Sequence, residues 1–96
     1  MPESTESYKL VLEALEKLGH PTRLRVLFSL ADKPASPKLI AAQHKLALGN
    51  VAYHVRAMER AQLIELFDER RVRGAVEHHY KMTRKGKKLF AKILEG

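Results

Sequence analysis

The chain has 96 residues, of which 45% are hydrophobic and 30% charged, as expected for one folded domain with a modest core. It contains no cysteine, which excludes disulfides, thiolate nucleophiles and thiolate metal sites, and we expect a cytoplasmic protein. The net charge of +7 is concentrated in residues 70–96, which hold nine basic and two acidic side chains. Such a block is typical of a phosphate-binding surface, a membrane-surface patch or a solvated face, and we favour the first.

Two helices are predicted in the first third of the chain. No part of the sequence has an apolar run long enough for a membrane span. Apolar residues recur at helical spacing from Tyr8 to Leu18, and Gly19 is able to end this helix in the left-handed region. Pro21 suits the first turn of a second helix, which is expected to end near Asp32. The expected buried face of the second helix consists of Leu24, Leu27, Phe28 and Ala31.

A third and a fourth helix are separated by only a short turn. Ser36 offers an N-cap oxygen to the third helix, which is expected to end near His44. A fourth helical pattern follows after about three residues, and it places Val51 and Met58 on one face. Two helices joined by so short a turn predict a helix-turn-helix over residues 36–60.

Residues 63–82 are predicted to form a β-hairpin. The segments 63–68 and 75–82 are rich in β-branched, apolar and aromatic residues, and residues 70–74 between them form a basic tip. Side chains alternate between the two faces of a strand, so the second strand has a core face and an opposite face. The expected core face holds Val76, His78, Tyr80 and Met82, and the opposite face holds Ala75, Glu77, His79 and Lys81.

A last helix is predicted after Thr83, which is able to cap it. Its apolar stripe lies behind a cluster of lysines and arginines, which suits either phosphate contact or the solvated face of a dimer helix. One small domain does not cover both this stripe and that of the first helix, so a homodimer is expected. The predicted dimer residues are Tyr8, Val11 and Leu15 on the first helix and Leu89, Phe90 and Ile93 on the last.

The order of these elements resembles that of the ArsR-type winged-helix repressors over nearly the whole chain. The segments that carry the resemblance are LGHPTRLRVL at 18–27, GNVAYHVRAM at 49–58 and YKMTRKG at 80–86. The resemblance implies a single, mainly α domain over residues 1–96, with about five helices and a two-stranded wing at 63–82. It also implies a symmetric dimer, joined through the first and last helices, that places two recognition helices in successive major grooves.

The chain departs from this family's pattern in two respects. Ala47 stands where similar sequences carry a capping Ser or Thr, a change that costs the fourth helix about 1 kcal/mol. The chain also lacks both the Cys-rich motif and the His and carboxylate ligands of the metal-responsive members, so we expect no metal and no cofactor. Its five histidines have no helical ligand spacing, and we expect them to have hydrogen-bonded structural roles.

The fourth helix and the hairpin carry the candidate DNA-binding residues. A helix that reads DNA needs hydrogen-bonding side chains opposite its core face, and a basic wing suits phosphates or the minor groove. The candidates are Gly49, Asn50, Tyr53 and Arg56 on the helix and Arg70, Arg71 and Arg73 on the wing. An ordinary solvated helix face and a soluble hairpin tip are the alternatives, but a basic wing after a helix-turn-helix favours DNA.

The sequence therefore predicts a transcriptional regulator that binds double-stranded DNA sequence-specifically, as a dimeric repressor that reads an inverted repeat. The alternative is a winged-helix module for protein–protein interaction, in which the same surfaces contact an acidic protein. No nucleophile elbow, Gly-rich phosphate loop or metal-spaced cluster occurs, so we expect no catalytic residues and no enzyme activity. The sequence indicates neither a membrane partner nor a particular small-molecule effector.

Overall fold

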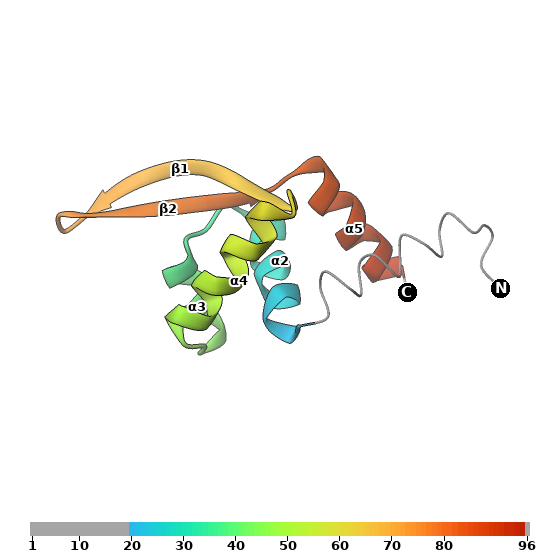
Figure 1. The fold of residues 1–96 in the computed structure, drawn as a ribbon, viewed down its shortest axis with the longest axis horizontal. Helices are drawn as coiled ribbons and strands as arrows, with labels where there is room; N and C mark the ends of the chain where they lie inside the picture. The colour runs from blue at the N-terminus through green and yellow to red at the C-terminus, as the bar shows by residue number, and fades with distance from the viewer. Residues whose placement is uncertain (1–19, 96) are drawn as a thin grey trace.

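The computed structural model describes residues 20–95. In chain order these residues form α2 (Pro21–Asp32), α3 (Pro37–His44), α4 (Leu48–Arg60), β1 (Ile64–Val72), β2 (Ala75–Met82) and α5 (Arg84–Glu95). This order confirms the predicted winged helix-turn-helix, and the helix expected at 8–18 lies outside the described residues. In Figure 1, helices α2, α3 and α4 gather near the base of a long hairpin, and α5 follows at the end opposite its tip. Within the described range, no helix combines the length and hydropathy needed to cross a membrane.

The two helices of the helix-turn-helix begin differently. The Ser36 side chain caps α3 as predicted, because its Oγ accepts a hydrogen bond from the Leu39 backbone N–H at 3.1 Å. Helix α3 ends at His44, and the following residue, Lys45, adopts the left-handed conformation with φ 56°. Helix α4 begins after Ala47, and its first turn receives no side-chain cap. Helix α4 therefore begins without the side-chain hydrogen bond that fixes the start of α3.

The core lies between the helices and the base of the hairpin. Its fully buried apolar side chains are Val26, Leu27, Ile40, Val51, Val55, Met58, Leu63 and Ile64. The face predicted for α2 is wrong in part, because Val26 and Leu30 are buried while Phe28 is 52% exposed. Two overlapping apolar stripes run along α2, and periodicity does not choose between them. Phe28 lies instead at the side of the core, where its ring meets that of Phe90 edge-on at 5.1 Å.

The start of α5 packs against the residues that immediately precede β1. Thr83 caps α5 as predicted, since its Oγ1 accepts a hydrogen bond from the Gly86 backbone N–H at 3.0 Å. The same hydroxyl donates to the Gln62 carbonyl oxygen at 2.6 Å. A Cβ atom on Gly86 would overlap the carbonyl oxygen of Leu63. Glycine at this position therefore permits the helix to approach the backbone closely.

The hairpin is longer, and its tip shorter, than the sequence predicts. The strands are joined by two residues only, Arg73 with φ 52° and Gly74 with φ 81°. Two positive φ angles are those of a type I′ turn, which joins antiparallel strands without a further loop. Arg70 and Arg71 consequently belong to β1 and not to the tip. The register shifts by one residue between Leu66 and Asp68, so β1 contains a bulge.

The core face predicted for β2 is correct only near the base of the hairpin. Tyr80 is buried as expected, but Val76 is 51% exposed and His78 is exposed, because the hairpin extends beyond the core. His79, predicted to face away from the core, is only 3% exposed. Since His79 and Tyr80 lie on opposite faces of the strand, both faces of β2 are covered at its base. Ala35 bridges to Tyr80 there through two backbone hydrogen bonds.

Candidate nucleic-acid interface

Helix α4 buries one side in the core and leaves the other exposed. The buried side consists of Val51, His54, Val55 and Met58. The exposed side carries Gly49, Tyr53 and Arg56, which were predicted, and also Arg60, which was not. The step of four residues from Arg56 to Arg60 keeps both guanidinium groups on one face, and this spacing is the signal that would have identified Arg60.

Gly49 and Asn50, two of the predicted helix residues, differ in whether groups from other elements lie close to them. Nothing lies within 4 Å of the position that a Cβ atom on Gly49 would take, so this end of α4 is open to a close approach. Asn50 lies at the edge of the exposed side that faces α2, where its Nδ2 is 3.5 Å from the Thr22 hydroxyl oxygen. Asn50 is therefore partly committed to the contact between α4 and α2.

A groove of about 450 Å³ separates the helix-turn-helix from the wing. It is lined by residues from the start of α3, from the first turns of α4 and from β2 between Ala75 and Tyr80. The charged or titratable residues among those that line it are Lys38, Arg56, Glu77, His78 and Tyr80. The groove thus joins the exposed side of α4 to the wing as one continuous surface.

The strand register sorts the wing arginines onto different faces. Residues directly opposite each other in an antiparallel pair have their side chains on the same face. Arg71 pairs with Val76, which shares its face of β2 with Tyr80. Burial raises the pKa of Tyr80, and the charges that act on it come from Glu59 and Arg56 of α4, so this face looks onto α4. Arg71 therefore lies on the same face of the wing as Tyr80, the face that looks onto the recognition helix at the base of the hairpin.

Arg70 lies on the opposite face of the wing. It pairs with Glu77 across the hairpin, and its Nε is 3.3 Å from Oδ2 of Asp68 on its own strand. Arg73 occupies the turn itself, at the far end of the hairpin. The predicted set of three wing arginines thus contains one on the face of Tyr80, one on the face of Glu77 and one in the turn.

A cluster of rings and one guanidinium joins α4 to the start of α2. His54 is 5% exposed, and its Nδ1 accepts a hydrogen bond from Nε of Arg23 at 2.9 Å. The His20 ring lies 4.8 Å from the His54 ring, and the Tyr53 ring lies 5.2 Å from it. Burial, and then the charges of Arg23 and His20, lower the pKa of His54 below its ordinary value. Within residues 20–95, no group of three or more potential ligands is placed to hold a metal ion.

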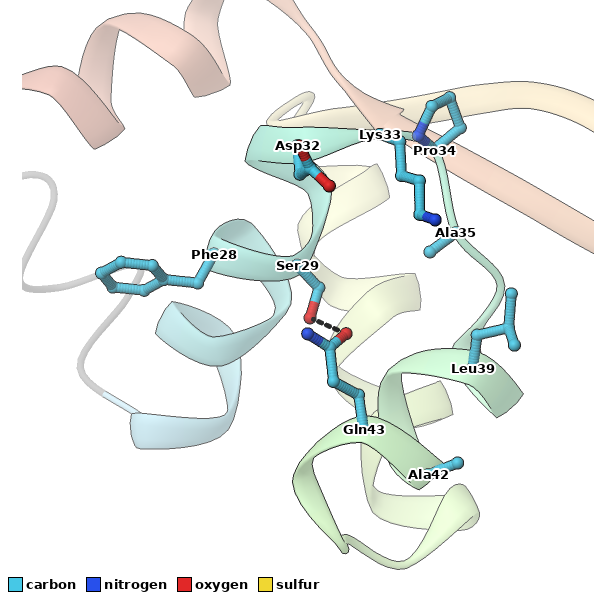
Figure 2. Close-up of a pocket in the computed structure, with 9 residues that line it drawn as sticks. All are labelled: Phe28, Ser29, Asp32, Lys33, Pro34, Ala35, Leu39, Ala42 and Gln43. Carbon is cyan, nitrogen blue, oxygen red and sulfur yellow. Dashed lines mark hydrogen bonds between the residues drawn. The ribbon is translucent and has the colours of Figure 1, made fainter.

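A second depression, of about 610 Å³, lies between the second half of α2, the segment 33–35 and α3. Figure 2 shows the side chains of Ser29 and Gln43 meeting between these two helices. Ser29 Oγ donates to Gln43 Oε1 at 3.1 Å and lies 2.9 Å from Nε2 of His44. These polar groups satisfy one another, so the cluster ties the first helix of the helix-turn-helix to α2.

The predicted dimer residues fall into three groups. Tyr8, Val11 and Leu15 lie outside the described residues. Leu89 and Phe90 are 3% and 8% exposed, because they pack in the core of their own chain. Ile93 packs partly against the core. Leu94, the next residue on α5, is 59% exposed, and Phe28, whose ring meets that of Phe90, is exposed as well.

Comparison with known proteins agrees with this architecture. A family described as helix-turn-helix domain matches residues 18–66, which are 49 of the 96 residues. No curated protein matches the chain. Among solved structures, the transcriptional repressor BigR from Xylella fastidiosa is 17% identical, with a TM-score of 0.69 over 94% of this chain and 86% of that one. A PadR family transcription regulator from Clostridium difficile is 19% identical, with a TM-score of 0.70 over 79% of this chain and 85% of that one.

A mutant of ZitR from Lactococcus lactis is also similar, with 17% identity and a TM-score of 0.62 over 77% of this chain. The chain spans about half the length of that protein, 49%. At such identities the likeness to these structures concerns the fold alone. The match over residues 18–66 covers both helices of the helix-turn-helix and the start of the wing. The chain therefore belongs to the helix-turn-helix domain family, and it has the winged-helix fold found in transcription regulators.

Proposed function

We propose that this protein is a homodimeric repressor of the ArsR type that binds double-stranded DNA at an inverted repeat. The observation that carries the proposal is that Arg56 of α4 lines the groove between the helix-turn-helix and the wing, and that Arg71 is paired with Val76, which lines the same groove. A duplex presents phosphates on both sides of its major groove, and a helix in that groove with a basic wing beside it meets both. Bound in this way, the protein would block access to the DNA that it covers.

The exposed side of α4 supplies the contacts to the major groove. Arg56 is suited to a guanine edge or a phosphate, and Tyr53 to a thymine methyl group or a phosphate. Arg60, one turn further along, extends the basic face towards the backbone. The open position at Gly49 lets the start of the helix approach the DNA.

The wing supplies charge and not sequence readout. Arg71 lies on the face of Tyr80, and Arg73 lies in the turn of a hairpin that projects from the helices (Figure 1). Arginines placed in this way neutralise phosphates or enter the minor groove, which strengthens binding to any sequence. We therefore assign specificity to α4 and general affinity to the wing.

A second copy of the chain supplies the second half of the interface. Phe28, Leu94 and the partly buried Ile93 expose apolar surface, and the predicted stripe of Tyr8, Val11 and Leu15 adds more. A twofold axis through these surfaces makes a self-complementary contact and pairs the two recognition helices. The centres of the two half-sites are expected roughly 34 Å apart, which is one turn of DNA.

Selection of duplexes from a randomised pool by the 96-residue chain tests this proposal. We expect enrichment of an inverted repeat, and much weaker binding to a scrambled duplex of the same composition. Equal binding of the selected and scrambled duplexes, or no enrichment at all, would contradict it. Binding to an acidic protein in place of DNA would support the interaction module instead.

A further inference from the structure

We propose that Arg23 and His54 form a positioning contact that sets the recognition helix on α2, and that this contact holds only while His54 is neutral. Acidification then weakens sequence-specific DNA binding. The inference rests on the proposed function for its DNA consequence. The contact itself stands on the geometry of the free protein.

The hydrogen bond defines the protonation state of His54. The Arg23 guanidinium is a donor with no acceptor atom, and its Nε lies 2.9 Å from Nδ1 of His54. Nδ1 must therefore carry no proton, and the proton of the neutral ring is on Nε2. The ring is 5% exposed, so water does not readily replace the guanidinium as its partner.

Helix α4 depends on such contacts because its own start is weakly held. No side chain caps it at Ala47, whereas Ser36 caps α3. Among the residues that the structure describes, the side-chain hydrogen bonds between α4 and α2 are that of His54 and one from Asn50 to Thr22, which is long at 3.5 Å. The bond at His54 is the shorter of the two, and it lies two residues before Arg56 on the same helix.

Protonation of His54 turns this attractive contact into a repulsive one. Both ring nitrogens then carry hydrogens, so Nδ1 becomes a donor that faces the Nε donor of Arg23. The titratable and charged groups that the described part of the chain brings to the ring are Arg23 and His20 from the start of α2 and Tyr53 from α4. Arg23 carries a positive charge, and His20 acts on the His54 ring in the same direction. Neither Arg23 nor His20 stabilises the charged ring of His54.

The direction of the pH effect follows from the lowered pKa. Burial, Arg23 and His20 lower the pKa of His54 below 6.5, so the neutral ring and its contact are fully present above that value. The contribution of this pair to stability is lost as pH falls from the ordinary pKa through the lowered pKa of the folded state. The binding-competent population shrinks over the same range, by up to about tenfold per pH unit.

The first arm of the test uses the free 96-residue chain. Nitrogen NMR of the imidazole rings at pH 7.5 is expected to show His54 with its proton on Nε2. On acidification, His54 is expected to titrate below the ordinary pH range of histidine, and the amide signals of the first turn of α4 to move with it. A proton on Nδ1, or α4 signals that do not follow the titration, would overturn the proposal.

The second arm measures the affinity for the selected duplex relative to the scrambled duplex between pH 7.5 and pH 5.0. We expect this ratio to fall with the same midpoint as the NMR titration, although the scrambled duplex is bound no less tightly as histidines become charged. In His54→Asn, whose amide oxygen takes the place of Nδ1 and does not titrate, the ratio should stay constant. His44→Asn, at the end of α3 and not among the residues that line the groove, is the matched control and should keep the wild-type fall.

A further variant, Arg23→Gln, tests the proposal if His54→Asn does not fold. Arg23→Gln retains a donor but removes the charge, so the midpoints of both measurements should move together to higher pH. A wild-type ratio that is independent of pH, or a fall that persists in folded His54→Asn, would refute the regulation of DNA binding. If no duplex is enriched, the proposed function fails, and the NMR arm still decides whether the contact positions α4.

Discussion

Arg70 and Arg71 are neighbours in β1, yet Arg71 lies on the face of Tyr80 while Arg70 lies on the opposite face and contacts Asp68. The bulge at Phe67 is the reason. Before the bulge, Leu66 lies on the face of Tyr80, and after it the odd-numbered residues take over that face. An unbroken strand would have placed Arg70 on the face of Tyr80 in place of Arg71.

The wing arginines are therefore expected to contribute unequally to DNA binding. Arg71→Ala should lower affinity for every duplex and reduce the slope of log affinity against log salt by about 0.9 for each phosphate that is no longer neutralised. Arg70→Ala removes the same charge from the opposite face and is the matched control, with a smaller effect on the slope. Titrations at several salt concentrations check this, and equal slopes for the two variants would contradict the assignment of faces.

Helix α4 is expected to control sequence preference. Arg56→Ala should weaken binding to the selected duplex by about 1–3 kcal/mol and leave the scrambled duplex nearly unaffected. Asn50→Ala should have a smaller effect on specificity, because Asn50 is shared with Thr22 of α2. Competition binding with both duplexes measures the difference. A decrease in affinity in Arg56→Ala that is equal for both duplexes would assign Arg56 to a phosphate and not to a base.

Two glycines should respond oppositely to alanine. Gly86→Ala places a methyl group onto the Leu63 carbonyl, and the forced shift of α5 should cost about 1–3 kcal/mol of unfolding free energy. Gly49→Ala has free space and should leave stability unchanged or raise it by up to about 1 kcal/mol. Thermal and denaturant unfolding of the two variants compare them directly. Equal stabilities would show that α5 adjusts to the methyl group without cost.

The exposed apolar surface on α5 is expected to hold the dimer together. Leu94→Glu introduces a charge at a position that is 59% exposed, so the single chain should still fold while self-association weakens. Leu39→Glu, at a position 52% exposed on α3, is the control and should leave association unchanged. Sedimentation velocity at micromolar concentration distinguishes the two, and a wild-type chain that is already monomeric there would argue against the dimer.

The helix-turn-helix could be predicted from the sequence because its signals are local. Ser36 ahead of a helical pattern, the short turn near Lys45 and the buried stripe from Val51 to Met58 each depend on residues a few positions apart. The absence of a side-chain cap at Ala47 was predictable for the same reason. Capping and helical periodicity act within one or two turns, so no distant part of the chain was needed.

The wing and the choice of faces were decided only by the tertiary structure. The bulge at Phe67 determines which arginine shares the face of Tyr80, and it depends on the pairing of β1 with β2. Phe28 lies at the edge of the core because α5 packs beside it, and His79 is buried because both faces of β2 are covered at its base. The hydrogen bond between Arg23 and His54 joins residues 31 positions apart. Alternation and periodicity specify which side chains share a face, but which face is covered depends on elements that are distant in the chain.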